Sequence, residues 1–135
     1  MVCANPFKKF LGLIILFSAF PTFGQGFKDW RYRMPIETGN WLDGEPLTNF
    51  PVLVVLGPHL SGFNYSQFES EPFGDLRFSD ASETNELPYE MELWDPSGTS
   101  YVWVRVPVLT NGTRLIEYWG KSDLTAPAYT TNGAV

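Results

Sequence analysis

Cysteine and histidine are almost absent from this chain of 135 residues. Its only cysteine is Cys3 and its only histidine is His59. Structural zinc sites, Cys–His pairs and Ser-His-Asp triads all need combinations of these two residue types. We therefore expect neither a transition-metal site nor a catalytic triad, and we place His59 in an exposed loop.

Positive charge is also scarce. Nine Lys and Arg residues stand against 15 Asp and Glu, which gives a net charge of −6, and two of the nine are Lys8 and Lys9. Nucleic-acid phosphates require clustered Lys and Arg, and anionic lipids attract basic segments. We expect no nucleic-acid partner and no docking on anionic membranes.

The N-terminus has the pattern of a secretory signal peptide. Lys8 and Lys9 precede an apolar run at 10–20, and Pro21 ends it. A membrane-spanning helix needs about 20 apolar residues, so this run is too short to remain in the bilayer. We interpret residues 1–26 as a signal peptide of a secreted or cell-surface protein, with a membrane anchor as the alternative. Cleavage after Gly24 and after Gly26 both fit.

Without that leader the chain has no cysteine, which excludes a disulfide framework and favours a bacterial source. The remainder divides into one domain at 27–120 and a Pro-, Thr- and Gly-containing tail at 121–135, which we interpret as a linker towards a missing downstream domain.

Short segments rich in β-branched and aromatic residues fill the domain, separated by turn signals. The expected strands lie at 30–36, 50–56, 74–80, 87–95, 100–109 and 113–120. The run 50–56 is continuously apolar, which predicts a strand covered on both faces. A short helical turn is expected at 65–68 and no substantial helix elsewhere. The pattern predicts an all-β, antiparallel β-sandwich, with jelly-roll connections as one option.

The sequence Asp95-Pro96-Ser97-Gly98 has the residues of a type I turn and predicts a hairpin. With Trp94 opposite Tyr101, one face of that hairpin pairs Glu92 with Trp103 and Glu90 with Arg105. The other face pairs Leu93 with Val102, Met91 with Val104 and Tyr89 with Val106, and this apolar set is the expected core face.

The dipeptide Asn111-Gly112 is a strong signal for a second hairpin. That hairpin pairs Val108 with Leu115 and Arg105 with Tyr118. It also places Glu117 opposite Val106 on the core face, an unfavourable position for a carboxylate, and Pro107 is a candidate bulge.

In this register four aromatic residues share the face opposite the valines, next to charged side chains. Such a platform can stack against sugar rings. The candidate ligand-binding residues are Trp94, Tyr101, Trp103, Tyr118, Glu90, Glu92 and Arg105. The alternative is that this face is itself buried, because aromatic residues dominate protein cores.

Two further sets of carboxylates are candidate sites. Glu90 and Glu92 lie about 7 Å apart on one strand, within the ~5–9.5 Å separation of glycosidase pairs, but alternating Glu on a strand usually forms a solvated face or an ion pair, here with Arg105. Asp75, Asp80 and Glu83 form a candidate calcium site, but turn formation and an Asp75–Arg77 contact that orders the start of a strand are the favoured explanation of these residues. We expect no catalytic residue and no other cofactor.

Several ordered motifs resemble one known family. The motifs are W-x-Y-R-x-P-I at 30–36, N-F-P-V-L-V at 49–54, G-D-L-R-F-x-D at 74–80, L-P-Y-E-x-E-x-W-D at 87–95, V-W-V-x-V-P at 102–107 and Y-W-G at 118–120. Together they are similar to the bacterial domain-of-unknown-function family 2341. The family usually has two tyrosines before the last glycine and an apolar residue where this chain has Glu117. The resemblance implies a module of a long exported protein, often beside a laminin-G or concanavalin-like lectin domain, and in some members linked to proton-channel proteins.

These observations favour a non-catalytic module of an exported bacterial surface protein that binds a polysaccharide or a partner domain. The alternative is a structural spacer that supports a downstream lectin-like or membrane-channel domain. A glycoside hydrolase is a distant third option.

Overall fold

The computed structural model describes residues 26–39, 45–133 and 135. Apart from Gly26, the expected signal peptide, with Cys3, lies outside the described residues. Within them, no helix combines the length and the apolar character needed to cross a bilayer. The elements are η1 (Phe27–Asp29), β1 (Tyr32–Glu37), β2 (Leu47–Leu56), η2 (Tyr65–Gln67), β3 (Arg77–Asp80), β4 (Tyr89–Leu93), β5 (Ser100–Leu109), β6 (Arg114–Trp119) and η3 (Ala128–Thr131).

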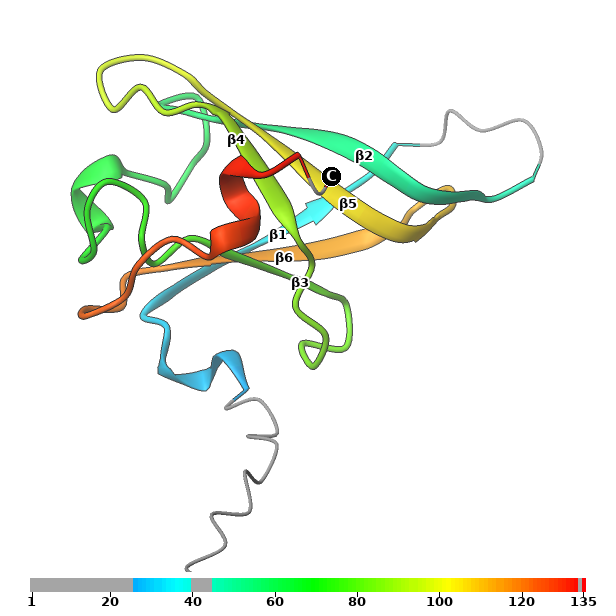
Figure 1. The fold of residues 1–135 in the computed structure, drawn as a ribbon, viewed down its shortest axis with the longest axis horizontal. Helices are drawn as coiled ribbons and strands as arrows, with labels where there is room; N and C mark the ends of the chain where they lie inside the picture. The colour runs from blue at the N-terminus through cyan, green and yellow to red at the C-terminus, as the bar shows by residue number, and fades with distance from the viewer. Residues whose placement is uncertain (1–25, 40–44, 134) are drawn as a thin grey trace, which may run out of the picture.

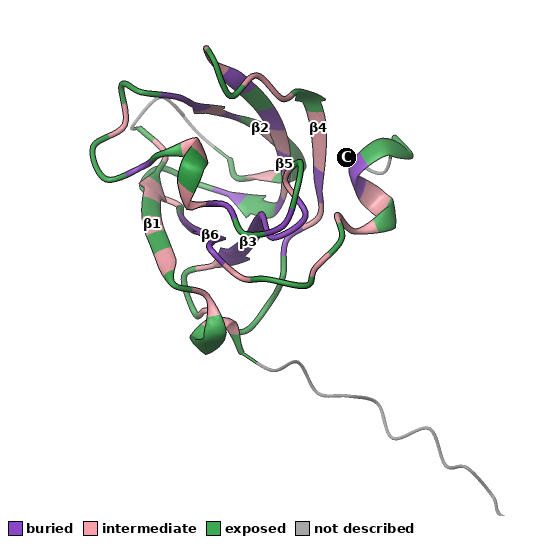
Figure 2. Cartoon of the chain, turned by 90° about the vertical axis from the view of Figure 1, so that its left-hand side faces the viewer, coloured by how far each residue is buried: buried purple, intermediate pink, exposed green. Residues whose placement is uncertain are grey.

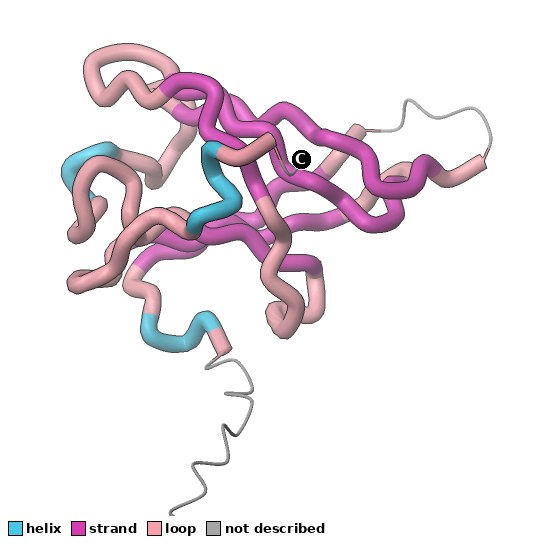
Figure 3. The backbone as a smooth tube through the Cα atoms, in the orientation of Figure 1, coloured by secondary structure: helices cyan, strands magenta, loops and turns pink. Residues whose placement is uncertain are grey.

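The six strands form two antiparallel sheets that pack face to face (Figure 1). The β6 sheet has the order β1-β6-β3, and the β5 sheet has the order β2-β5-β4. The three 3-10 turns are the only helical elements in the described part of the chain, and they interrupt its loops (Figure 3). The expectation of an all-β sandwich without substantial helix is confirmed, as is the helical turn near Tyr65.

The core lies between the sheets, where the buried residues gather (Figure 2). Alternation along β5 buries Val102, Val104 and Val106 and turns the intervening residues outward. The valine face predicted from the sequence is therefore confirmed as core. Its other buried apolar members include Val54, Leu56, Leu76, Phe78, Leu87, Tyr89, Leu109, Leu115 and Trp119.

The predicted register between β4 and β5 is wrong by two residues. Tyr89 pairs with Val104, Glu90 with Trp103 and Met91 with Val102. A bulge between Met91 and Leu93 then places Leu93 beside Tyr101. The Asp95–Gly98 turn itself is confirmed by the bond from the Gly98 N–H to the Asp95 carbonyl.

The bulge at Glu92 explains the altered faces of the next residues. A bulge adds one residue to one strand and reverses the alternation beyond it. Leu93, predicted to be in the core, is 47 % exposed. Trp94 instead turns inward and packs against Tyr65, Phe68 and Phe73.

The second predicted hairpin is wrong in its partner. A turn does form at Asn111-Gly112, with the Thr113 N–H bonded to the Thr110 carbonyl. However, β6 crosses to the other sheet and pairs with β1 and β3, so the expected pairs of β5 residues with Leu115, Glu117 and Tyr118 do not form. Along β5, β2 occupies one edge from Ser100 to Leu109, and β4 occupies the other edge from Tyr101 to Val104.

The expectation that the β2 segment is covered on both faces is also wrong. Val54 and Leu56 are buried, whereas Phe50 and Leu53 are 37 % and 42 % exposed. β2 is an edge strand whose outer face carries no covering layer in the described part of the chain. His59 lies in the following turn and is exposed, as expected.

A candidate binding face on the β5 sheet

The outer face of the β5 sheet is an open, partly aromatic surface. Tyr101, Trp103 and Arg105 alternate outward along β5. The cross-strand pairs place Val55 and Leu93 on either side of Tyr101, Leu53 and Glu90 on either side of Trp103, and Pro51 beside Arg105. Directly paired residues project from the same face of a sheet. This outer face thus combines two aromatic rings, several aliphatic side chains and charges of both signs.

Trp103 is the centre of this surface. Its indole Nε1 donates a hydrogen bond to Glu92 Oε2 at 2.6 Å, which fixes the ring relative to β4. One hollow of about 490 Å³ is lined by Trp103, Pro51, Glu90, Glu92 and Val135. A second hollow, of about 470 Å³, adjoins Trp103 on the β2 side and is lined also by Phe50 and Leu53. The same indole therefore borders two hollows.

The structure separates two residues from the platform predicted by sequence. Trp94 packs inward, as described above, because of the bulge at Glu92. Tyr118 lies in the other sheet, is 1 % exposed and stacks on Phe27 at a ring-centroid distance of 4.3 Å. The hydroxyl group of Tyr118 is also bound, since it donates to Glu83 at 3.0 Å and contacts Ser79 at 3.1 Å. Neither aromatic ring belongs to the outer face of the β5 sheet.

The other five candidates lie together on or beside this face: Tyr101, Trp103, Glu90, Glu92 and Arg105. The sequence interpretation missed Leu53 and Pro51 of β2 and the outward position of Leu93. The local signal for the two β2 residues was weak, because a continuously apolar run carries no alternation. Whether these residues bind a ligand stays a prediction.

The acidic residues of the candidate calcium site are each engaged in protein contacts. Asp80 accepts hydrogen bonds from Ser82 and Asn85. Burial alone raises its pKa, but these bonds outweigh it and hold the pKa of Asp80 below its ordinary value. Glu83 binds Arg33 through two hydrogen bonds of 3.0 and 2.8 Å. Among the described residues, no group of three acidic, His or Cys side chains is arranged to hold a metal ion.

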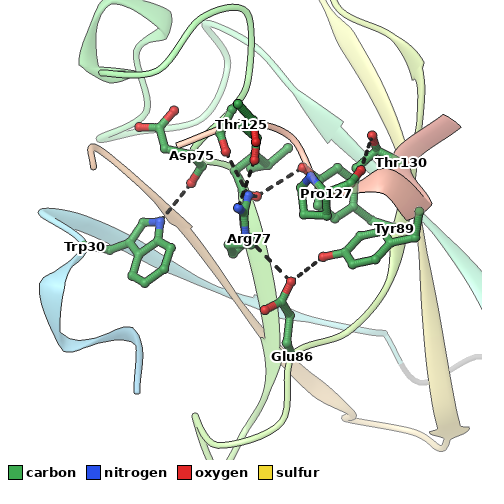
Figure 4. Close-up of polar contacts among 11 residues, drawn as sticks. Trp30, Asp75, Arg77, Glu86, Tyr89, Thr125, Pro127 and Thr130 are labelled. Carbon is green, nitrogen blue, oxygen red and sulfur yellow. Dashed lines mark hydrogen bonds and ion pairs between the residues drawn. The ribbon is translucent and has the colours of Figure 1, made fainter. Parts of the chain in front are cut away.

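Asp75 lies instead at a junction between three segments. It is fully buried, and its Oδ2 accepts hydrogen bonds from the N–H groups of Glu69, Gly120 and Lys121 at 2.8–3.0 Å. Its main-chain carbonyl accepts a bond from Trp30 Nε1 at 2.8 Å. Figure 4 shows this residue next to Arg77 at the start of β3. Asp75 thus joins the loop before β3 to the end of β6.

Arg77 forms a second junction, with the C-terminal strap (residues 121–131). Its guanidinium donates to the carbonyls of Gly74, Leu76 and Thr125 and lies 3.6 Å from a carboxylate oxygen of Glu86 (Figure 4). Arg77 is buried, so it satisfies carbonyl groups that water does not reach. It therefore attaches the strap to the edge of β3, whereas sequence reasoning had paired it with Asp75.

Other contacts fix the strap along the β3–β4 side of the sandwich. Ser70 Oγ donates to the Lys121 carbonyl and accepts from the Leu124 N–H. Tyr129 of η3 packs edge-on against Tyr89 of β4 at 5.6 Å and its hydroxyl donates to Glu86. The assignment of 121–135 as a linker stays a prediction, and the structure adds that residues 121–131 lie against the β-sandwich.

The main chain of the strap approaches Gly74 closely, and substitution of this glycine tests whether that approach stabilises the fold. A Cβ atom at Gly74 would lie 2.6 Å from the Leu124 carbonyl oxygen, which belongs to the main chain of the strap. Gly74→Ala should therefore displace the strap and lower the free energy of unfolding by about 1–3 kcal/mol. Urea unfolding of Gly74→Ala measures this, with Gly26→Ala as the control because no atom lies within 4 Å of its added Cβ. Equal stabilities of the two variants would show that the strap contributes little.

The geometry defines a small antiparallel β-sandwich with one open face and a C-terminal strap along one side. Residues 72–134 match the family described as a domain of unknown function, DUF2341. Over this segment the match confirms the DUF2341 assignment that the sequence motifs indicated. The matched segment contains β3 to β6 and the strap, whereas β1 and β2, with the motifs at 30–36 and 49–54, precede it. No curated protein and no solved structure matches the chain.

Proposed function

We propose that this domain is a non-catalytic binding module of an exported bacterial surface protein and that its ligand is a polysaccharide. The observation that carries the proposal is Trp103, a tryptophan on the outer face of the β5 sheet that lines two hollows. Aromatic rings supply a large apolar contact area, and the neighbouring polar groups can orient a ligand. Glu90, Glu92 and Arg105 are polar groups on or beside this face that can also hydrogen-bond to sugar hydroxyls.

The two hollows support an extended rather than a compact ligand. Trp103 and Pro51 line both hollows; the first also includes Glu90 and Glu92 of β4, and the second continues along β2 towards β1. A polymer that crosses the strands can place one sugar ring on Trp103 and its neighbours in the two hollows. The leader pattern at 1–26 is consistent with a protein that meets such polymers outside the cell.

We expect Trp103→Ala to weaken polysaccharide binding at least about tenfold, as is typical of a central aromatic contact. The measurement is retention of the 135-residue chain on gels that contain soluble β-glucan, chitin-derived or peptidoglycan-derived polymers. Val108→Ala is the matched control, because Val108 is 53 % exposed and lines neither hollow. Urea unfolding of both variants confirms that any loss of binding does not come from loss of the fold.

Two results would contradict the polysaccharide proposal. One is the absence of binding by the unmodified chain to every polymer tested. The other is a loss of several kcal/mol of stability in Trp103→Ala, since that would make Trp103 a structural residue.

The second candidate is a spacer whose outer face packs against a neighbouring domain of the same polypeptide. The specific observation in its favour is that Leu53 and Leu93 are exposed apolar side chains and that Val135 lines one of the hollows. Large exposed apolar patches commonly mark protein contacts. If the domain is a spacer, the unmodified chain should not be retained by any polysaccharide, and Leu53→Ser should weaken its contact with the neighbouring domain. A glycosidase remains the third option and requires polymer hydrolysis that Glu92→Gln abolishes.

A further inference from the structure

Glu117 is the most unusual residue of the core. It lies in the middle of β6, the central strand of its sheet, and is fully buried. Leu115 and Trp119, two positions away on either side, both belong to the hydrophobic core, so the alternation of the strand directs Glu117 between the two sheets. Its direct cross-strand neighbours on the same face are Met34 of β1 and Phe78 of β3.

In the described part of the chain, no group donates a hydrogen bond to the carboxyl group of Glu117 or offsets its charge. Neither Oε1 nor Oε2 of Glu117 has a hydrogen-bond partner. Cations at adjacent positions project from the opposite face and are engaged elsewhere: Arg33 binds Glu83, and Arg77 binds Thr125 and Glu86. An ionised carboxylate in this position would be a buried charge without a counter-charge, which is strongly unfavourable.

The ionisable groups on the inner faces of the surrounding strands do not change this result. On β1 the inner group is Tyr32, which stacks on Trp119. On β3 it is Asp80, which accepts hydrogen bonds from Ser82 and Asn85. On β4 it is Tyr89, whose hydroxyl donates to the Leu76 carbonyl. The outward groups are Arg33 and Glu37 of β1, Arg77 of β3, Glu90 and Glu92 of β4, Tyr101 and Arg105 of β5, and Arg114 and Tyr118 of β6. β2 has no ionisable side chain.

We propose that Glu117 makes the packing of the two sheets dependent on the protonation of its carboxyl group. The sheets pack closely over this residue while its carboxyl group carries a proton, and this packing loses stability when the proton is released. No covalent step is involved, since the proton passes to water or hydroxide as the core opens. This inference is independent of the polysaccharide proposal, because it concerns the inner rather than the outer face.

The direction of the pH dependence follows from burial. Desolvation raises the pKa of Glu117 from 4.5 to about 8. Between these values the unfolded chain has lost the proton and the folded chain retains it, so the folded state loses stability as the pH rises. The stability that comes from the protonated carboxyl group of Glu117 is fully present below the pKa of the unfolded chain, and it is lost as the pH rises through the pKa of the folded chain. The unfolding equilibrium constant should rise about tenfold for each pH unit in this window.

The test is urea unfolding of the 135-residue chain at about pH 6, 7 and 8, compared with Glu117→Gln. The unmodified chain should show an unfolding constant about 50-fold larger at the upper pH than at the lower, because the folded carboxyl is half ionised at its own pKa. Glu117→Gln has nearly the same shape but cannot ionise, so its curve should be flat. His59→Gln is the matched control, because it removes the exposed histidine and should leave the slope unchanged. Parallel slopes in the unmodified chain and Glu117→Gln would overturn the proposal.

A second measurement covers the case in which Glu117→Gln does not fold. Infrared difference spectra of the unmodified chain should contain the carbonyl stretch of a protonated carboxylic acid at about pH 7, and this band should disappear together with the folded signal as the pH rises. Glu117→Leu, which keeps an apolar core, should lack the band. Absence of the acid band from the unmodified chain at that pH would overturn the proposal.

Discussion

Asp75→Ala is expected to lower the free energy of unfolding by about 3–5 kcal/mol, because it removes the acceptor of three backbone donors at once. Oδ2 of Asp75 binds the N–H groups of Glu69, Gly120 and Lys121, and the residue is fully buried. Alanine leaves those donors without a partner at the point where the loop before β3 meets the end of β6. Urea unfolding monitored by tryptophan fluorescence measures the loss, and Trp30, which donates to the Asp75 carbonyl, reports on the same junction.

Two further variants separate acceptor geometry from a general effect of removing acid. Asp75→Asn retains a side-chain oxygen and should lose less stability than Asp75→Ala. Asp29→Ala removes an exposed aspartate that lies 3.5 Å from Lys121, and it should change stability by no more than about 1 kcal/mol. A loss in Asp75→Ala as small as that of Asp29→Ala would show that water replaces the missing acceptor.

Local sequence patterns predicted what depends on neighbouring residues. The alternation from Tyr101 to Val106 identified the buried valines, and the Asp95–Gly98 turn formed where its residues require it. These features follow from the two-residue period of a strand and from turn chemistry, which act over a few residues. They placed Tyr101, Trp103 and Arg105 correctly on one outward face.

The choice of partner strand could not be predicted in the same way. Asn111-Gly112 favours a hairpin, but β2 occupies one edge of β5 along its whole length and β4 part of the other, and β6 pairs with β1 and β3 instead. Tyr118 therefore lies on the other sheet, and Leu53 of β2 occupies the place beside Trp103. The sequence predicted a core position for Glu117 by pairing it with Val106; the residue is buried, but its neighbours are Met34 and Phe78.

Bulges are the other source of error. One extra residue at Glu92 exchanges the faces of Leu93 and Trp94, which moves an aromatic ring from the predicted platform into the core. The burial of Trp94 depends on Phe68 and Phe73, which lie more than 20 residues away in sequence. Such tertiary contacts override the local alternation.

The second large effect is expected for Gly120, the last residue of the Y-W-G motif. Gly120 has φ +83°, a left-handed conformation that L-residues with a Cβ adopt at a cost of about 1–2 kcal/mol. A Cβ atom there would also lie 2.5 Å from Cδ2 of Tyr32, whose ring stacks on Trp119. Because both effects act together, Gly120→Ala should lower the free energy of unfolding by about 2–4 kcal/mol.

Gly112→Ala supplies the matched control for this prediction. Gly112 has a similar φ of +72°, but no atom lies within 4 Å of its added Cβ. The conformational cost is therefore common to both variants, and only Gly120→Ala must displace the Tyr32 ring. The difference between their unfolding free energies measures the steric contribution alone, and a double variant with Tyr32→Ala should remove most of that difference. Equal losses in Gly112→Ala and Gly120→Ala would mean that the Tyr32 ring moves aside freely and that the glycine is required only for its backbone conformation.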